Sequence, residues 1–126
     1  MKLRFDKNSL RLRVKKSDIE KLREKNSIHE VIAFPNGSFV YKLLLSDDLT
    51  EMAARIQDQS IEVIIPAELA LAWMNNDETG LYRTALFNNQ QLDIIVEKDF
   101  PCKNRPEEDS SDSFSEPSTL ILPSQC

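Results

Sequence analysis

Alternating apolar and polar positions at the start of the chain predict a β-hairpin. The pattern has period two over Lys2–Phe5 and again over Leu10–Val14, and the intervening Asp6-Lys7-Asn8 is typical of a turn. The spacing then changes, because Ile19 and Leu22 fall on one face of a helix. A strand pair followed by a short amphipathic helix is therefore expected within the first 25 residues.

A second hairpin is predicted directly after this helix. Ser17 or Asp18 can cap the helix at its start, and Asn26 can end it in a left-handed conformation. Apolar residues then recur over Ile28–Phe34 and Phe39–Leu45, on either side of a Pro-Asn-Gly-Ser turn. The first half of the chain is thus predicted to be a β-β-α-β-β unit.

The same order of elements returns in the second half. Pro66 suits the first turn of its helix, and Leu69, Ala70 and Trp73 are expected to face the core. A linker over residues 46–52 joins the two halves. The predicted strands of the second half are residues 54–56, 61–65, 81–87 and 92–96.

The two halves are also similar in sequence. Residues 54–65 align with residues 3–14 without a gap, so that Arg55 meets Arg4 and Ser60 meets Ser9. After a shift of two residues, Phe87 meets Phe34. Chance is the alternative, since any two amphipathic strands look alike, but the repeated order of elements favours an internal duplication.

These patterns predict one α+β, mostly β domain over residues 1–101. Repeat 1 covers about residues 2–45 and repeat 2 about residues 53–98, and the duplicated units are expected to form a compact barrel with two short helices. Such a chain would be a monomeric pseudo-dimer. Residues 102–126 are expected to form an acidic, disordered tail, with Thr119–Leu122 either docked on a sheet edge or unstructured.

Composition narrows the function classes. The 126 residues are 40% hydrophobic and 29% charged, with only two glycines, so Gly-rich phosphate loops are excluded. No apolar run approaches the roughly 20 residues of a membrane span. With cysteines only at Cys102 and Cys126, a disulfide framework is not indicated and a cytoplasmic location is expected. No metal site and no cofactor is predicted, and the acids near Cys102 are expected to be a solvated tail.

Basic residues are concentrated at the start of the chain. Residues 1–25 carry ten bases and four acids, whereas residues 26–106 carry six bases and twelve acids. The arginines of the first hairpin alternate with apolar residues and must point outward. The candidate nucleic-acid stripe consists of Lys2, Arg4, Arg11, Arg13, Lys15 and Lys16. The alternatives are a solvated face, or a face that pairs with the acidic second repeat or tail.

Cys102 is a candidate reactive thiol. It lies near Lys98, Lys103 and Arg105, and neighbouring cations lower the pKa of a thiol. His29 is the one histidine, and no motif places it beside a nucleophile. No catalytic residue is therefore predicted, and an ordinary structural cysteine is the alternative interpretation of this site.

The segment Ser60–Ala70 resembles the AbrB/MazE swapped-hairpin domain. It shares with that family a strand running into Ile-Pro-x-Glu-Leu, then a short helix, an acidic turn and a hairpin. The resemblance implies two interlocked β-β-α-β-β copies and DNA binding. The family's usual Gly-Asp before the third strand is represented here only by Asn76–Gly80.

The whole chain resembles a family of small bacterial proteins with no assigned function. The residues that carry this resemblance are Lys2–Arg13 and Glu97–Cys102, and it spans residues 1 to about 114. We therefore expect a non-enzymatic binding or regulatory module whose partner is DNA or another protein. The alternative is a small enzyme or ligand-binding protein that uses Cys102 and the cations around it.

Overall fold

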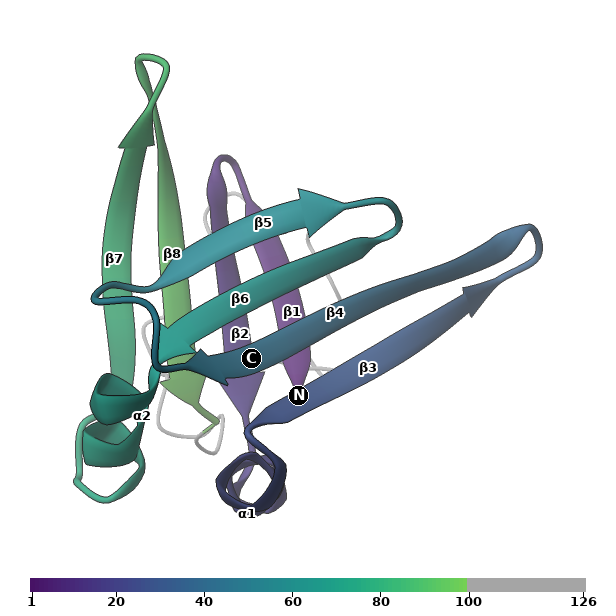
Figure 1. The fold of residues 1–126 in the computed structure, drawn as a ribbon. Coiled ribbons are helices and arrows are strands. Elements are labelled where there is room, and N and C mark those ends of the chain that lie inside the picture. Colours follow the sequence, from purple (N-terminus) through teal and green to yellow (C-terminus); the bar gives the residue numbers. More distant parts are fainter. Residues whose placement is uncertain (100–126) are drawn as a thin grey trace, which may run out of the picture.

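Residues 1–99 form eight strands and two helices (Figure 1). The structure is a computed structural model, and it describes residues 1–99. The elements, in chain order, are β1 (Lys2–Asp6), β2 (Ser9–Val14), α1 (Lys16–Lys25), β3 (Ser27–Phe34), β4 (Gly37–Ser46), β5 (Ala53–Gln57), β6 (Ser60–Pro66), α2 (Ala67–Met74), β7 (Gly80–Phe87) and β8 (Gln90–Lys98).

The strands form two four-stranded sheets, and each sheet takes one hairpin from each half of the chain. Sheet A has the order β1-β2-β8-β7, and sheet B has the order β3-β4-β6-β5. The central pair of each sheet, β2 with β8 and β4 with β6, is parallel, whereas every hairpin pair is antiparallel. Neither half therefore builds a sheet from its own strands.

The prediction of a compact barrel is wrong. The two sheets lie face to face with their strands crossing, and both helices lie at the same end of the molecule (Figure 1). No ladder joins an edge strand of sheet A to an edge strand of sheet B within residues 1–99. A barrel needs closure by hydrogen bonds, but within residues 1–99 β1 does not pair with β3, and β5 does not pair with β7.

The pairing registers of the two sheets correspond position by position. Leu10 pairs with Ile94 in sheet A, and Ile61 pairs with Tyr41 in sheet B. Adding 51 to a residue number in β1 or β2, and 53 to one in β3 or β4, converts each register of the first half into one of the second. Each position in sheet A thus has a defined counterpart in sheet B.

The inner faces of the two sheets form the core. Its largest fully buried side chains include Leu12, Val14, Leu43, Val63, Ile65, Ile94 and Val96, together with Trp73 from α2 and Leu22 from α1. Leu69 is 40% exposed, so the expectation that it faces the core is wrong. The phase of α2 instead buries Ala70, Trp73 and Met74.

Only one of the two ends of α1 agrees with the prediction from the sequence. Asn26 adopts the left-handed conformation expected at the end of the helix. The start differs from prediction, because Lys15 is the N-cap residue and Asp18 is the third residue of the first turn. The Asp18 carboxylate accepts a hydrogen bond from the Lys15 backbone N–H, N–Oδ2 2.9 Å, and so fixes the junction of β2 and α1.

Candidate functional site

An apolar cleft of about 390 Å³ lies between the hairpin β5–β6 of sheet B and the hairpin β7–β8 of sheet A. Its walls are aliphatic and aromatic side chains together with two arginines. Ile56 and Phe87, which line it, are 74% and 44% exposed, so the cleft opens to solvent toward the hairpin tips. Pockets of this size and composition are typical of small-ligand sites.

Small side chains create this space. Ala54 on β5 and Ala85 on β7 both line the cleft. Their counterparts on the opposite side of the molecule are Leu3 on β1 and Ile32 on β3. The gap between β5 and β7 is therefore lined by shorter side chains than the corresponding gap between β1 and β3.

The wall on β8 shows the same difference. Leu92 and Ile94 line the cleft, and their counterparts on β4 are Phe39 and Tyr41, whose ring centroids lie 6.4 Å apart. The aromatic pair fills space on the side of β1 and β3 that aliphatic residues leave open on the side of β5 and β7. The cleft was not predicted from the sequence, although the aligned halves place Ala54 opposite Leu3 and Ala85 opposite Ile32.

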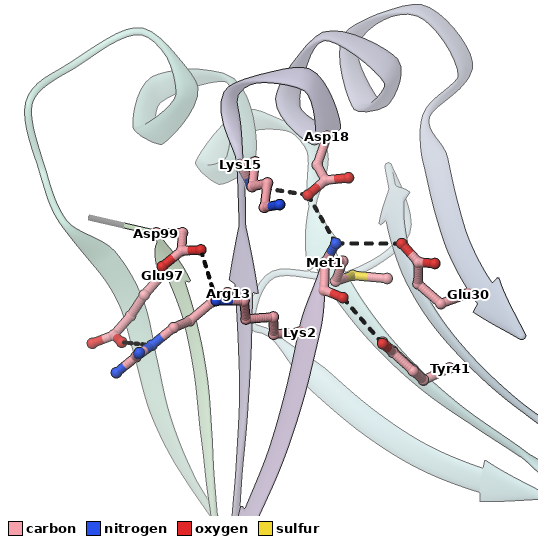
Figure 2. Close-up of polar contacts among 9 residues, drawn as sticks. All are labelled: Met1, Lys2, Arg13, Lys15, Asp18, Glu30, Tyr41, Glu97 and Asp99. Atoms are coloured by element: carbon pink, nitrogen blue, oxygen red, sulfur yellow. Dashed lines mark hydrogen bonds and ion pairs between the residues drawn. The ribbon is translucent and has the colours of Figure 1, made fainter. Parts of the chain in front are cut away.

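Met1 occupies the space between β1 and β3. Its amino group lies 3.0 Å from Asp18 Oδ2 and 3.3 Å from Glu30 Oε2 (Figure 2). Its carbonyl oxygen accepts a hydrogen bond from Tyr41 O–H, at 3.0 Å. The cluster joins β1, α1, β3 and β4 through charge-assisted contacts around the partly buried Met1.

These contacts shift two pKa values. Burial raises the pKa of the Asp18 carboxyl, but the Lys15 N–H and the Met1 ammonium together outweigh it, and the net pKa is lowered. Burial raises the pKa of the Tyr41 hydroxyl, and the negative charges of Glu30 and Asp18 add to that rise. Asp18 is therefore held ionised and Tyr41 neutral at neutral pH.

Within residues 1–99, the predicted basic stripe divides into residues with an acidic partner and residues without one. Arg4 and Arg11 are cross-strand neighbours on the outer face of β1 and β2, beside a polar hollow of about 200 Å³ that also includes Asp6 and Ser9. Arg4, Lys15 and Lys16 are exposed. The stripe thus begins on the outward face that the alternation predicts.

Acidic residues at the end of β8 and just after it neutralise the other part of the stripe. Glu97 Oε1 lies 3.4 Å from Arg11 Nε and 3.6 Å from Arg13 Nε, and Lys2 Nζ lies 3.4 Å from Asp99 Oδ2 (Figure 2 draws the contacts of Arg13 and Lys2). Arg13 is buried, with 8% of its surface exposed. The alternative in which the stripe pairs with the acidic second repeat therefore describes these three cations.

The Arg11 and Arg13 contacts with Glu97 are ion pairs more than hydrogen bonds. Their separations are long, and neither Nε–H group has a hydrogen-bond partner within residues 1–99. Tyr82 O–H donates to the other Glu97 oxygen at 3.1 Å, and burial followed by this contact raises the Tyr82 pKa. The Glu97 carboxylate thus contacts Arg11, Arg13 and Tyr82 on the outer face of sheet A.

The remaining sequence candidates contribute less to a site. Cys102 and the acidic tail lie outside the described residues, so the thiol remains a prediction. In the part of the chain that the structure describes, no group of three or more His, Cys, Asp or Glu side chains gathers in a way that could hold a metal. None of the helices in that same part has the length and apolar character needed to cross a membrane.

The fold and the cleft define a mostly β protein of two facing sheets with an open apolar site at one edge. Its sequence matches the family of unknown function DUF7009 over residues 1–118, and the chain belongs to that family. This match confirms the expected membership in a family with no assigned function. Comparisons with curated proteins and with solved structures gave no match.

Proposed function

We propose that this protein is a non-enzymatic binding module whose site is the cleft between β5–β6 and β7–β8. The observation that carries the proposal is the 390 Å³ apolar cavity between β5–β6 and β7–β8, which Ala54 and Ala85 line where the counterpart positions hold Leu3 and Ile32. Its charged lining residues are Arg55 and Arg83, and a guanidinium group donates hydrogen bonds but accepts none. A lining of this kind favours the binding of an apolar group over catalysis by proton transfer.

An ancestral duplication with an AbrB-like swapped-hairpin arrangement is part of this proposal. It is supported by the exchange of hairpins between sheets and by the constant register offset between the halves. A fused pair would bury its mutual interface inside one chain. Size-exclusion chromatography with light scattering should therefore give the mass of a monomer, and a stable dimer would contradict this part.

The unequal sides explain how a fused pair gains a site. Two identical chains would have identical gaps at both edges, whereas one chain can fill one gap and open the other. Tyr41 and Phe39 fill space on the side of β1 and β3, whereas Ala54 and Ala85 leave room between β5 and β7. Covering solvent-exposed apolar walls with an apolar group is favourable, so we expect the cleft to bind a ligand.

Binding of a neutral dye tests the cleft without assuming a charge on the ligand. We expect N-phenyl-1-naphthylamine to bind with one-to-one stoichiometry at temperatures where the protein is cooperatively folded. The double variant Ala54→Leu/Ala85→Ile introduces the side chains found at the counterpart positions, and it should reduce the dye affinity at least about tenfold. Thr84→Ile adds the same isoleucine to the outer face of β7 and is the matched control. Equal affinity in the wild type and the double variant would refute the proposal.

Nucleic-acid binding is the second candidate function. The observation that favours it is the exposed side chain of Arg4, which lies across the strand pair from the half-buried Arg11 at the start of the stripe. Deletion of residues 107–126, which carry five acids and no bases, should strengthen binding to duplex DNA. The affinity should then fall log-linearly with salt. Failure of the truncated protein to bind DNA at low salt would end this candidate.

A further inference from the structure

The two arginines of the cleft differ in what they already bind. Arg55 Nε lies 2.6 Å from Glu62 Oε1, a short charge-assisted contact on the outer face of sheet B. Arg83 instead belongs to the inner face, because its cross-strand partner Ile94 is fully buried. Arg83 is therefore the cation that a ligand in the cleft would meet.

Arg83 has capacity for another acceptor. Its guanidinium donates to the Met52 carbonyl oxygen and lies 3.5 Å, Nη2–Oε2, from Glu51. The Glu51 side chain is 66% exposed, so solvent screens this pair and little free energy holds it. A guanidinium presents five N–H donors in a planar fork that matches a carboxylate.

The counterpart of Arg83 on the other side of the molecule is Glu30. There the charge meets an opposite charge in the gap, since Glu30 Oε2 lies 3.3 Å from the Met1 amino group. On the cleft side, the Arg83 guanidinium lies beside the apolar space. Met52, which corresponds to Met1, is an internal residue and carries no ammonium group. This arrangement favours a ligand that combines an anionic group with an apolar chain.

From this geometry we propose that the cleft binds a medium-chain amphipathic carboxylate. The apolar chain lies against Ala54, Ala85 and Leu92, and the carboxylate pairs with Arg83 in place of Glu51. The inference rests on the proposed function, because it names the class of ligand for the same cleft. It adds a requirement for negative charge that the cleft alone does not impose.

Competition against the bound neutral dye measures this requirement. Decanoate, decanol and decyltrimethylammonium, each below its micelle-forming concentration, share a ten-carbon chain and differ in charge. We expect decanoate to displace the dye at about tenfold lower concentration than decanol, since one charge-assisted contact has that effect. Decyltrimethylammonium should be weaker than both. From octanoate to decanoate, the affinity should rise about fourfold per methylene, as burial of apolar surface predicts.

Charge variants then assign the preference to Arg83. Arg83→Gln keeps an N–H donor for the Met52 carbonyl and should remove the preference for decanoate over decanol, with decanol affinity nearly unchanged. Arg83→Lys should retain part of the preference for decanoate. Lys25→Gln, which removes a positive charge from an exposed position of α1, should retain all of it.

The outcomes separate the two proposals. Dye binding in the cleft with equal displacement by decanoate and decanol would overturn the carboxylate proposal and leave the proposed function standing. An unchanged preference in folded Arg83→Gln would also overturn it. Absence of dye binding to the wild type would remove both proposals together.

Discussion

Met1 and Met52 hold corresponding places in the two sheets, and each offers its carbonyl oxygen to a side chain of the facing sheet. Met1 precedes β1 and accepts a hydrogen bond from Tyr41 of β4, whereas Met52 precedes β5 and accepts one from Arg83 of β7. These contacts fasten an edge strand of each sheet to the other sheet where no backbone ladder does so. The donor is a tyrosine hydroxyl in the first contact and a guanidinium group in the second.

Removal of the Tyr41 hydroxyl should weaken the attachment of β1. Tyr41→Phe keeps the ring beside Phe39 but leaves the Met1 carbonyl oxygen without its donor. We expect the free energy of unfolding to fall by about 1 kcal/mol at pH 7. Urea denaturation at fixed temperature measures this difference, and Tyr82→Phe, at a largely exposed position, is the matched control.

The same hydroxyl should give a distinct dependence on alkaline pH. Burial, then Glu30 and Asp18, raise the pKa of Tyr41, so the folded state keeps the proton longer than the unfolded chain. The contribution of Tyr41 is therefore complete below the unfolded pKa of about 10 and declines as the pH rises through the higher folded value. In a Tyr82→Phe background, the stability lost through Tyr41→Phe should shrink from pH 7 to pH 11. A constant loss would contradict the assigned shift.

Asp18 should give the opposite pH dependence. Its folded-state pKa is lowered, so its contribution is present above the unfolded pKa of about 4 and is lost as the pH falls through the folded value. Asp18→Asn removes the ion pair with the Met1 amino group, and we expect a cost of about 1–2 kcal/mol at pH 7. The difference from the wild type should narrow below pH of about 4. Glu20→Gln, exposed on the same helix, should change stability by less than about 0.5 kcal/mol.

The hairpins could be predicted from the sequence because alternation and turn chemistry are local. The two-residue turns lie at residues that can adopt positive φ. Asn88 and Asn89, for example, both have the positive φ that such tight turns require. The prediction of a closed barrel was wrong because closure depends on contacts between the edge strands of different sheets, which are not local in sequence. Period-two patterns do not indicate whether such edge strands pair with each other or leave a cleft, as β5 and β7 do.

The neutralisation of the arginines also depends on a long-range pairing. Arg13 meets Glu97 because β2 pairs in parallel with β8, across more than 80 residues of chain. The outward direction of the arginines follows from alternation alone, whereas their partners follow from the exchange of hairpins. An alignment of the two halves combined with a swapped-hairpin arrangement could have found both the pairing and the cleft.

Gly80 should be intolerant of any side chain. A Cβ atom there would lie 2.6 Å from the Val96 carbonyl oxygen and 2.8 Å from Glu97 Cγ, and the oxygen belongs to the backbone of the neighbouring strand. Because β8 cannot retreat without disturbing its pairing with β7, Gly80→Ala should cost about 1–3 kcal/mol of unfolding free energy. Thr79→Ala, one residue earlier, retains the carbonyl that accepts the Lys98 N–H and should be nearly neutral. A fully stable Gly80→Ala protein would show that the two strands lie farther apart.

Glu97 should contribute more to stability than Glu62, although each carboxylate faces two cations. Glu97 neutralises Arg13, whose side chain is 9% exposed, whereas Glu62 contacts Arg55, whose side chain is 59% exposed. Removal of one partner from a buried pair leaves an uncompensated charge, but solvent compensates an exposed one. We expect Glu97→Gln to cost about 2 kcal/mol and Glu62→Gln less than about 1 kcal/mol in matched urea titrations.

The same variants test whether the paired arginines can serve a nucleic acid. Glu97→Gln removes the negative charge that holds Arg11 and Arg13, so DNA affinity and its salt dependence should both increase if the stripe is an interface. Glu62→Gln removes an equal charge from the other sheet and sets the effect of net charge alone. Equal DNA binding by the two variants would leave the stripe as a structural face of sheet A, in which Glu97 holds β8 of the second half against β2 of the first.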